Sequence, residues 1–289
     1  MAGRFESLAW HRAVARIVSA GDHQALADAL VEAIGAAVEH EGTCLLAFHR
    51  DARPEVLHHS LEPAGRRHYV DRYLAGPYLL DPLYHLAQKQ ECPSLCRFRD
   101  EVPDRFHASP YYKRYCERTH LLDEMDYLTS VSPRTTLVLV VGRRTRRFVK
   151  AEVNRLASIE PLVQSVLTRF WQQRGDGAGQ QAADGSVHRR LTECFDRFGE
   201  AVLTDREREI SQLLLRGYSS KAIARQLDIA PGTVMVHKRN LFAKLGVSSQ
   251  YQLFSLLIDA LESGTPVRQT ERAPAPHSGR IRGSRNPRR

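Results

Sequence analysis

The chain has 289 residues, of which 42% are hydrophobic and 26% are charged, and its formal net charge is +9. This length and apolar content can support two globular domains. No apolar run approaches the ~20 residues that a transmembrane helix needs, and the amino terminus lacks a secretory hydrophobic segment. The five cysteines show no disulfide framework and fit a reducing compartment. We therefore expect a cytoplasmic protein with no membrane partner, rather than a secreted or membrane protein.

The first part of the chain alternates between helical and extended patterns. The predicted elements are, in chain order, helices near 5–20 and 24–40, a strand near 43–49, a mostly irregular middle with short helices, and a hairpin of strands near 126–131 and 135–142. The hairpin is expected to turn at Ser132 and Pro133. A last helix near 148–171 carries an apolar stripe and should kink at Pro161. An antiparallel sheet with packed helices makes residues 1–171 an α+β sensor domain, similar to GAF and PAS domains.

Residues 172–188 differ in composition from the segments on either side. They are rich in Gly, Gln, Ala and Asp, and they show no hydrophobic period. Such a composition predicts a flexible linker. We therefore expect a second domain to begin near residue 189.

Four short helical patterns follow one another in this second domain. Thr204 and Glu207 have the spacing of a capping box, and Gly217 is suited to end the helix that they begin. A second helix is predicted over residues 219–227, and Pro231 is well suited to the first position of a third. A short helix, a tight turn and another helix are the arrangement of many DNA-binding domains.

The third of these helices has a basic outer face. The side that faces away from its apolar stripe holds Gly232, Val236, Arg239 and Ala243. No Asp or Glu lies between Asp228 and Asp259, so this helix presents net positive charge to a polyanion. We assign residues 189–262 to a small all-α, four-helix helix-turn-helix domain that binds double-stranded DNA.

Several motifs of this region match a known family. They are the LT-x-RE start at 203–207, Gly217, Lys221 with IA at 223 and 224, TV at 233 and 234, His237, and KLGVSS at 244–249. Together they resemble the LuxR-type helix-turn-helix, in which the third helix enters the major groove and the fourth supports dimerisation. The resemblance implies base-edge contacts for Met235, Val236 and Arg239. It implies positions near phosphates for Lys221, Thr233, His237, Lys238 and Lys244.

Three residues depart from the family pattern. Ala222 stands where the family usually has glutamate, and Ala230 stands where it usually has serine, so two helix caps worth ~1 kcal/mol each are expected to be missing. Met235 replaces a common polar side chain and favours apolar contact, for example with a thymine methyl group. We expect the fold to be kept and the base preference to differ.

A second resemblance concerns the sensor domain. The segment YVDRYLAGPYLLDP at 69–82 is similar to part of the acyl-homoserine-lactone receptors, through Tyr69, Tyr73, Asp81 and Pro82. Tyr69 replaces the usual tryptophan, and HLLDEM at 120–125 supplies acids where those receptors commonly carry glycine. The resemblance implies a small-molecule ligand, and the candidate ligand-binding residues are Tyr69, Tyr73, Asp81 and Glu124. Core packing of the two tyrosines and a capping role for Asp81 would explain the same pattern without a ligand.

Residues 263–289 carry seven arginines, one glutamate and almost no large apolar side chain. This composition cannot bury a core and predicts disorder. A basic arm that adds affinity for phosphates and a dispensable solvated extension are both compatible with it.

Two other functional classes would need residues that the sequence does not contain. A phosphorylated response regulator would need an early acidic pair and regularly alternating strands and helices around Asp51, and neither is found. An enzyme is not expected, because the chain shows no nucleophile elbow, phosphate loop or catalytic cluster. Cys92 and Cys96 have no second pair that would complete a metal site.

The sequence thus predicts a transcription regulator with an amino-terminal ligand-sensing domain and a carboxy-terminal DNA-binding domain. We expect a homodimer without a cofactor, with RNA polymerase as a further candidate partner. Leu256, which lies apart from the apolar stripe of the fourth helix, is a candidate dimer contact.

Overall fold

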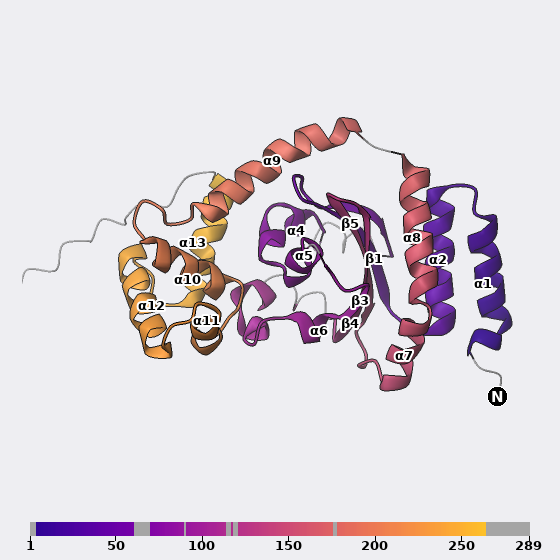
Figure 1. Cartoon of the computed structure of the whole chain (residues 1–289), viewed down its shortest axis with the longest axis horizontal. Helices are drawn as coiled ribbons and strands as arrows, with labels where there is room; N and C mark the ends of the chain where they lie inside the picture. Colours follow the sequence, from indigo (N-terminus) through magenta and orange to yellow (C-terminus); the bar gives the residue numbers. More distant parts are fainter. Residues whose placement is uncertain are drawn as a thin grey trace, which may run out of the picture.

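The protein, a computed structural model, is described over residues 4–60, 70–89, 91–113, 117, 121–175 and 178–263. One antiparallel sheet with the strand order β2-β1-β5-β4-β3 is followed by a helical carboxy-terminal domain (Figure 1). The strands are β1 Gly42–His49, β2 Glu55–His59, β3 Leu95–Arg97, β4 Asp123–Ser132 and β5 Thr135–Arg143. The predicted fold class, an α+β domain joined to a four-helix helix-turn-helix domain, is confirmed. The predicted tail at 263–289 lies almost wholly outside the described residues.

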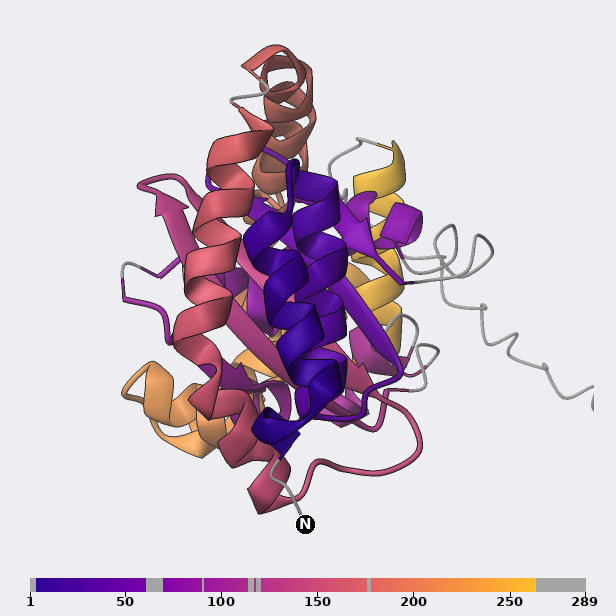
Figure 2. The same cartoon turned by 90° about the vertical axis from the view of Figure 1, so that its right-hand side faces the viewer.

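Helices cover one face of the sheet. They are α1 Leu8–Ser19, α2 His23–Ala37, α7 Lys150–Ser158 and α8 Glu160–Arg174. Helices α2 and α8 lie against the sheet and α1 lies outside α2 (Figures 1 and 2). Side-chain caps from Ser7 and Asp22 begin α1 and α2. The helix predicted over 148–171 is divided into α7 and α8 at Ile159, two residues before Pro161, which has no backbone N–H to continue the first helix.

A buried ion cluster ties the end of β5 to α7. Arg143 is 1% exposed, and its guanidinium donates to both carboxylate oxygens of Glu152, with Nη1 at 2.8 Å and Nη2 at 3.2 Å. Arg146 also binds both oxygens, at 2.9 and 2.8 Å. The bonds from the two arginines hold the pKa of Glu152 well below its ordinary value.

Short helical segments cover the opposite face of the sheet. They are α4 Arg72–Leu74, η3 Pro77–Leu80, α5 Pro82–Ala87, α6 Phe98–Glu101 and η4 Phe106–Ala108. The hydrophobic core on this side is continuous with that of the carboxy-terminal domain. The core under α2 and α8 is a separate cluster.

The segment predicted as a flexible linker is largely helical. Helix α8 continues to Arg174, and helix α9 runs from Ala178 to Asp196, so it covers much of 172–188. Figure 1 shows α9 crossing from the end of α8 to the carboxy-terminal helices. Alanine and glutamine have high helix propensity, which accounts for a helix without an apolar stripe. A hydrogen bond of 2.8 Å between Tyr78 Oη and His188 Nδ1 fixes α9 to the sensor domain.

The carboxy-terminal domain has the predicted order of helices and caps. Its helices are α10 Asp205–Leu215, α11 Ser220–Gln226, α12 Pro231–Leu245 and α13 Gln250–Ser263. Thr204 and Glu207 form the predicted capping box, and Ser219 caps α11. Gly217 adopts a φ of +95°, a conformation that favours glycine. Ala230 provides no side-chain cap for α12, as expected from its missing hydroxyl.

Candidate functional site

Helix α12 presents one face to its own domain and the other to solvent. Val234 and Leu241 are fully buried against α10 and α11. Met235 and Val236 are 64% and 47% exposed, and Arg239 is exposed beside them. Large apolar side chains that are exposed next to a basic residue suit contact with base edges in a DNA groove, because this contact removes their apolar surface from water.

The residues predicted to lie near phosphates differ in how exposed their side chains are. Lys221 and Thr233 are exposed, and His237 is half-buried. The half-buried ammonium of Lys238 lies 5.4 Å from the centre of the Phe242 ring, and burial, with a smaller contribution from Arg105 of the sensor domain, lowers its pKa. Lys238 thus lies on the side of α12 that is close to the sensor domain.

Lys244 has an internal partner. Its ammonium donates to Glu207 Oε2 at 2.6 Å, and the Glu207 side chain is only 4% exposed. Burial, the largest influence, raises the pKa of Glu207, but bonds from Lys244 and Thr204 outweigh it and the pKa is lowered. Lys244 therefore stabilises the first turn of α10, a role that its place in the family motif did not indicate.

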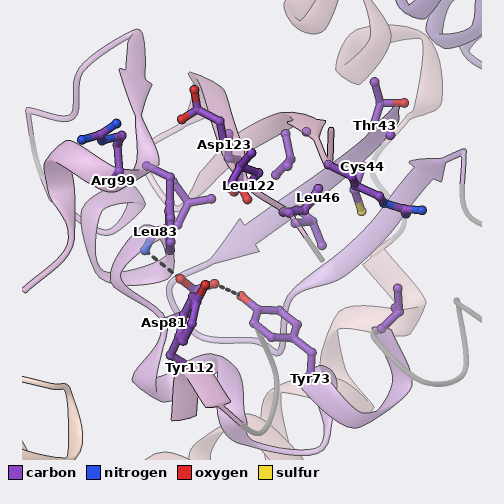
Figure 3. Close-up of a pocket in the computed structure, with 18 of the residues that line it drawn as sticks. Thr43, Cys44, Leu46, Tyr73, Asp81, Leu83, Arg99, Tyr112, Leu122 and Asp123 are labelled. Carbon is purple, nitrogen blue, oxygen red and sulfur yellow. Dashed lines mark hydrogen bonds between the residues drawn. The ribbon is translucent and has the colours of Figure 1, made fainter. Parts of the chain in front are cut away.

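A cavity of about 250 Å³ lies in the sensor domain between the sheet and the short helices. Its apolar wall comes from both layers and includes Leu46, Val56, Leu83, Phe98 and Val140. Figure 3 shows Leu46, Leu83, Tyr73 and Asp81 around it. An apolar hollow with a few polar groups is the usual form of a small-molecule site.

Tyr73 and Asp81 meet at the wall of this cavity (Figure 3). Tyr73 Oη donates to Asp81 Oδ2 at 2.7 Å, and the backbone N–H of Leu83 donates to Oδ1 at 2.9 Å. Asp81 is thus both the cap of α5 and a residue of the cavity wall, and its role in ligand binding stays a prediction. Burial raises the pKa of Asp81 to about 6. Tyr69 lies outside the described residues.

The acidic run at 123–126 divides its side chains between the two faces of the sheet. Asp123 is buried and satisfied, since the Arg97 guanidinium binds both of its oxygens and the Phe148 N–H donates at 2.8 Å. Glu124 lines the cavity. Asp126 is fully buried on the same face, and within the described part of the chain only the carboxyl group of Glu124 is a hydrogen-bond partner for it.

One segment joins the cavity to the DNA-binding domain. His107, Tyr111 and Tyr112 line the cavity. A few residues earlier, Asp104 accepts hydrogen bonds from the Ser219 backbone N–H at 3.0 Å and from its hydroxyl at 2.5 Å. The Arg105 N–H donates to the Gly217 carbonyl at 3.1 Å. No local pattern predicts this connection, because residues 98–112 fall in a stretch without hydrophobic periodicity.

Asp51 and the possible metal ligands are not placed in a site of this kind within the described residues. The Asp51 side chain is 61% exposed and pairs with Arg134 at 2.5 Å, outside any cavity described here. No three His, Cys, Asp or Glu side chains of the described residues come together as metal ligands. Among the described helices, none has the length and apolar character required to cross a membrane.

The fold and the exposed face of α12 define a two-domain regulator of the helix-turn-helix class. Residues 201–257 match the family described as bacterial regulatory proteins, luxR family. A putative HTH-type transcriptional regulator of Aeromonas salmonicida is 32% identical over 156 residues, which cover 52% of this chain and 80% of that protein. The chain belongs to the LuxR family of transcriptional regulators.

The sensor domain has a relative among solved structures. The crystal structure of the VqsR LBD domain from Pseudomonas aeruginosa is 24% identical and covers 57% of this chain and 97% of that one, with a TM-score of 0.51. This likeness supports the same fold for the sensor domain.

Proposed function

We propose that this regulator binds DNA sequence-specifically through α12 and that a small molecule in the sensor-domain cavity controls this binding. The observation that carries the proposal is the segment from Asp104 to Tyr112, which lines the cavity at one end and holds the helix-turn-helix at the other. A ligand that contacts Tyr111 or Tyr112 would change the position of residues bonded to Ser219. Two sites coupled in this way can shift each other's affinity.

Within this proposal, α12 contacts base edges through Met235, Val236 and Arg239. Arginine can bind guanine with two hydrogen bonds, and the two apolar side chains suit thymine methyl groups. Lys221, Thr233, His237 and Lys238 would lie near phosphates. Lys238 is half-buried beside the sensor domain. The packing of the two domains would therefore affect whether its ammonium group can contact a DNA phosphate.

A homodimer belongs to the same proposal, because one short helix contacts too few bases to select a genomic site. Two α12 helices related by a twofold axis would recognise an inverted repeat with half-sites about one helical turn apart. Leu256, the contact predicted from the sequence, is half-buried and packs against the domain's own core. Tyr251, 53% exposed on the same helix, is the more accessible apolar side chain for a partner. RNA polymerase contact and a cytoplasmic location also remain proposals.

Selection from a random pool of DNA duplexes tests the DNA-binding part. The full chain should enrich an inverted repeat. Val236→Asp should abolish enrichment by placing a negative charge on the exposed face of α12, whereas Val18→Asp, the same change at a 72% exposed valine on α1, should keep the enriched motif. No enriched motif with the wild-type chain, or the same motif with Val236→Asp, would contradict the assignment of α12.

A further inference from the structure

We propose that the cavity takes an organic cation, namely a small amine with an apolar body, whose charged head binds the carboxylates of Glu124 and Asp126. The inference rests on the proposed function, since it names the chemical class of the ligand at the same cavity. It differs from the lactone resemblance, because a neutral ligand supplies no charge for these two residues.

The first observation is where β4 places its side chains. Met125 and Tyr127 belong to the core under α2 and α8, while Leu128 belongs to the core on the cavity side. Because side chains alternate along a strand, Glu124 and Asp126 share the face of Leu128. Glu124 lines the cavity, and Asp126 lies one step further along the same face.

The second observation is that this pair lacks a counterion. No Lys, Arg or His of the described residues forms an ion pair with either carboxylate, and the fully buried Asp126 has only the carboxyl group of Glu124 as a hydrogen-bond partner there. Asp123, a neighbouring acid that also borders the cavity, shows what a satisfied buried acid looks like here, with Arg97 and a backbone N–H as donors. Two buried carboxyl groups that have only each other as partners are costly to ionise, because no cation or outside donor stabilises the charged form.

The electrostatics of the pair agree with a missing cation. Burial raises the pKa of Glu124 to about 7, although a hydrogen bond with Asp126 lowers it, and the charge of Asp81 adds to the increase. Burial and the carboxylate of Glu124 raise the pKa of Asp126 well above its ordinary value, and Asp81 and Asp123 add to the effect. An ammonium group would supply both the charge and the N–H donors that these oxygens lack.

The rest of the cavity indicates what else the ligand carries. Leu46, Val56, Leu83 and Val140 form an apolar wall, which favours a hydrocarbon chain or ring attached to the amine. Three arginines also line the cavity, but Arg72, Arg99 and Arg144 are all exposed, as expected of residues at its rim.

The test compares amines with neutral molecules of the same shape. Hexylamine, octylamine and 2-phenylethylamine are titrated into the full chain at pH 7.5 by calorimetry, beside 1-hexanol, 1-octanol and 2-phenylethanol. At least one amine should bind about tenfold or more tightly than its alcohol, as expected for a charged hydrogen-bonded head group. Glu124→Gln and Asp126→Asn should each reduce that preference to within about threefold. Glu101→Gln, a matched change of an exposed acid on α6, should leave it unchanged.

A second measurement needs no ligand. If the pair is uncompensated in the free protein, Glu124→Gln should keep or raise the Tm of the full chain at pH 7.5. A Tm lowered by several degrees would show that the protein itself already satisfies the carboxylate, and it would overturn the inference.

Equal binding of amines and alcohols, or no binding of any amine at millimolar concentration, would overturn it as well. If a neutral compound occupies the cavity and changes DNA affinity, the cation inference fails while the proposed function stands. If compounds bind the cavity and DNA affinity never changes, the proposed function fails.

Discussion

The contact between the two domains leads to a quantitative prediction. Asp104 accepts two hydrogen bonds from Ser219, at 3.0 Å from its N–H and 2.5 Å from its hydroxyl. The aspartate is exposed, so we take only ~1–2 kcal/mol for the two bonds together, less than the value for buried charged pairs. Asp104→Ala should therefore weaken docking of the helix-turn-helix about five- to thirtyfold.

Hydrogen exchange of the full chain measures this change directly. The Ser219 amide loses its acceptor in the variant, so it should exchange faster by up to the same factor, while amides inside β5 and α8 keep their rates. Asp205→Ala is the control, because that carboxylate is 95% exposed and pairs with Arg208 instead. Equal Ser219 exchange in wild type and Asp104→Ala would refute the docked contact. Faster exchange throughout the chain would show unfolding rather than undocking.

Three further predictions concern single residues. Arg239→Ala should cost ~1–3 kcal/mol of DNA-binding free energy and relax the preference at one base position, as measured by anisotropy titrations. Lys221→Ala should instead weaken binding to all sequences and lower the slope of log affinity against log salt by about one. If Arg239→Ala weakened binding to all sequences equally, base contact by Arg239 would be contradicted. Glu152→Gln should lower the free energy of unfolding by ~3–5 kcal/mol in urea titrations, because two arginines lose their charged partner, one of them buried; a change below 1 kcal/mol would exclude this role. Because the pKa of Glu124 is raised, the folded protein holds the proton of this carboxyl group more tightly than the unfolded chain does. The contribution of this proton to the free energy of unfolding is therefore present below pH 4.5 and is lost as the pH rises to about 7. Glu124→Gln should therefore reduce the stability gained between pH 7.5 and pH 5 by something on the order of 2 kcal/mol, and an unchanged difference would contradict a buried ionisable group.

Local signals were sufficient for the elements whose residues determine their own geometry. The capping box at Thr204 and Glu207 and the left-handed Gly217 both act within one helical turn, and both were predicted correctly. The hairpin was predicted because its turn residues separate two strongly apolar strands. Its first strand begins at Asp123 rather than 126, since β5 and the short β3 extend the pairing beyond the apolar run.

Other features depend on contacts between distant parts of the chain and could not be predicted from local patterns. Helix α9 contacts Tyr78 and α13, which lie far from it in the sequence. The sequence of its first half has no hydrophobic period, so local patterns did not predict a helix there. Lys244 has a motif position typical of a phosphate contact, yet its partner Glu207 lies 37 residues away. Tyr112 and its neighbours reach the cavity through an irregular segment, whose path is fixed by packing rather than by sequence pattern.

Ligand binding in the cavity and DNA binding by α12 are proposed to be coupled. The most direct test of this coupling is reciprocal titration of the full chain with its selected DNA and with whichever amine of the series binds most tightly. The amine should change the Kd for DNA by a factor in the range of about 5 to 150, and DNA should change the Kd for the amine by the same factor. If both the amine and the DNA bind and neither changes the Kd of the other, the proposed coupling is contradicted.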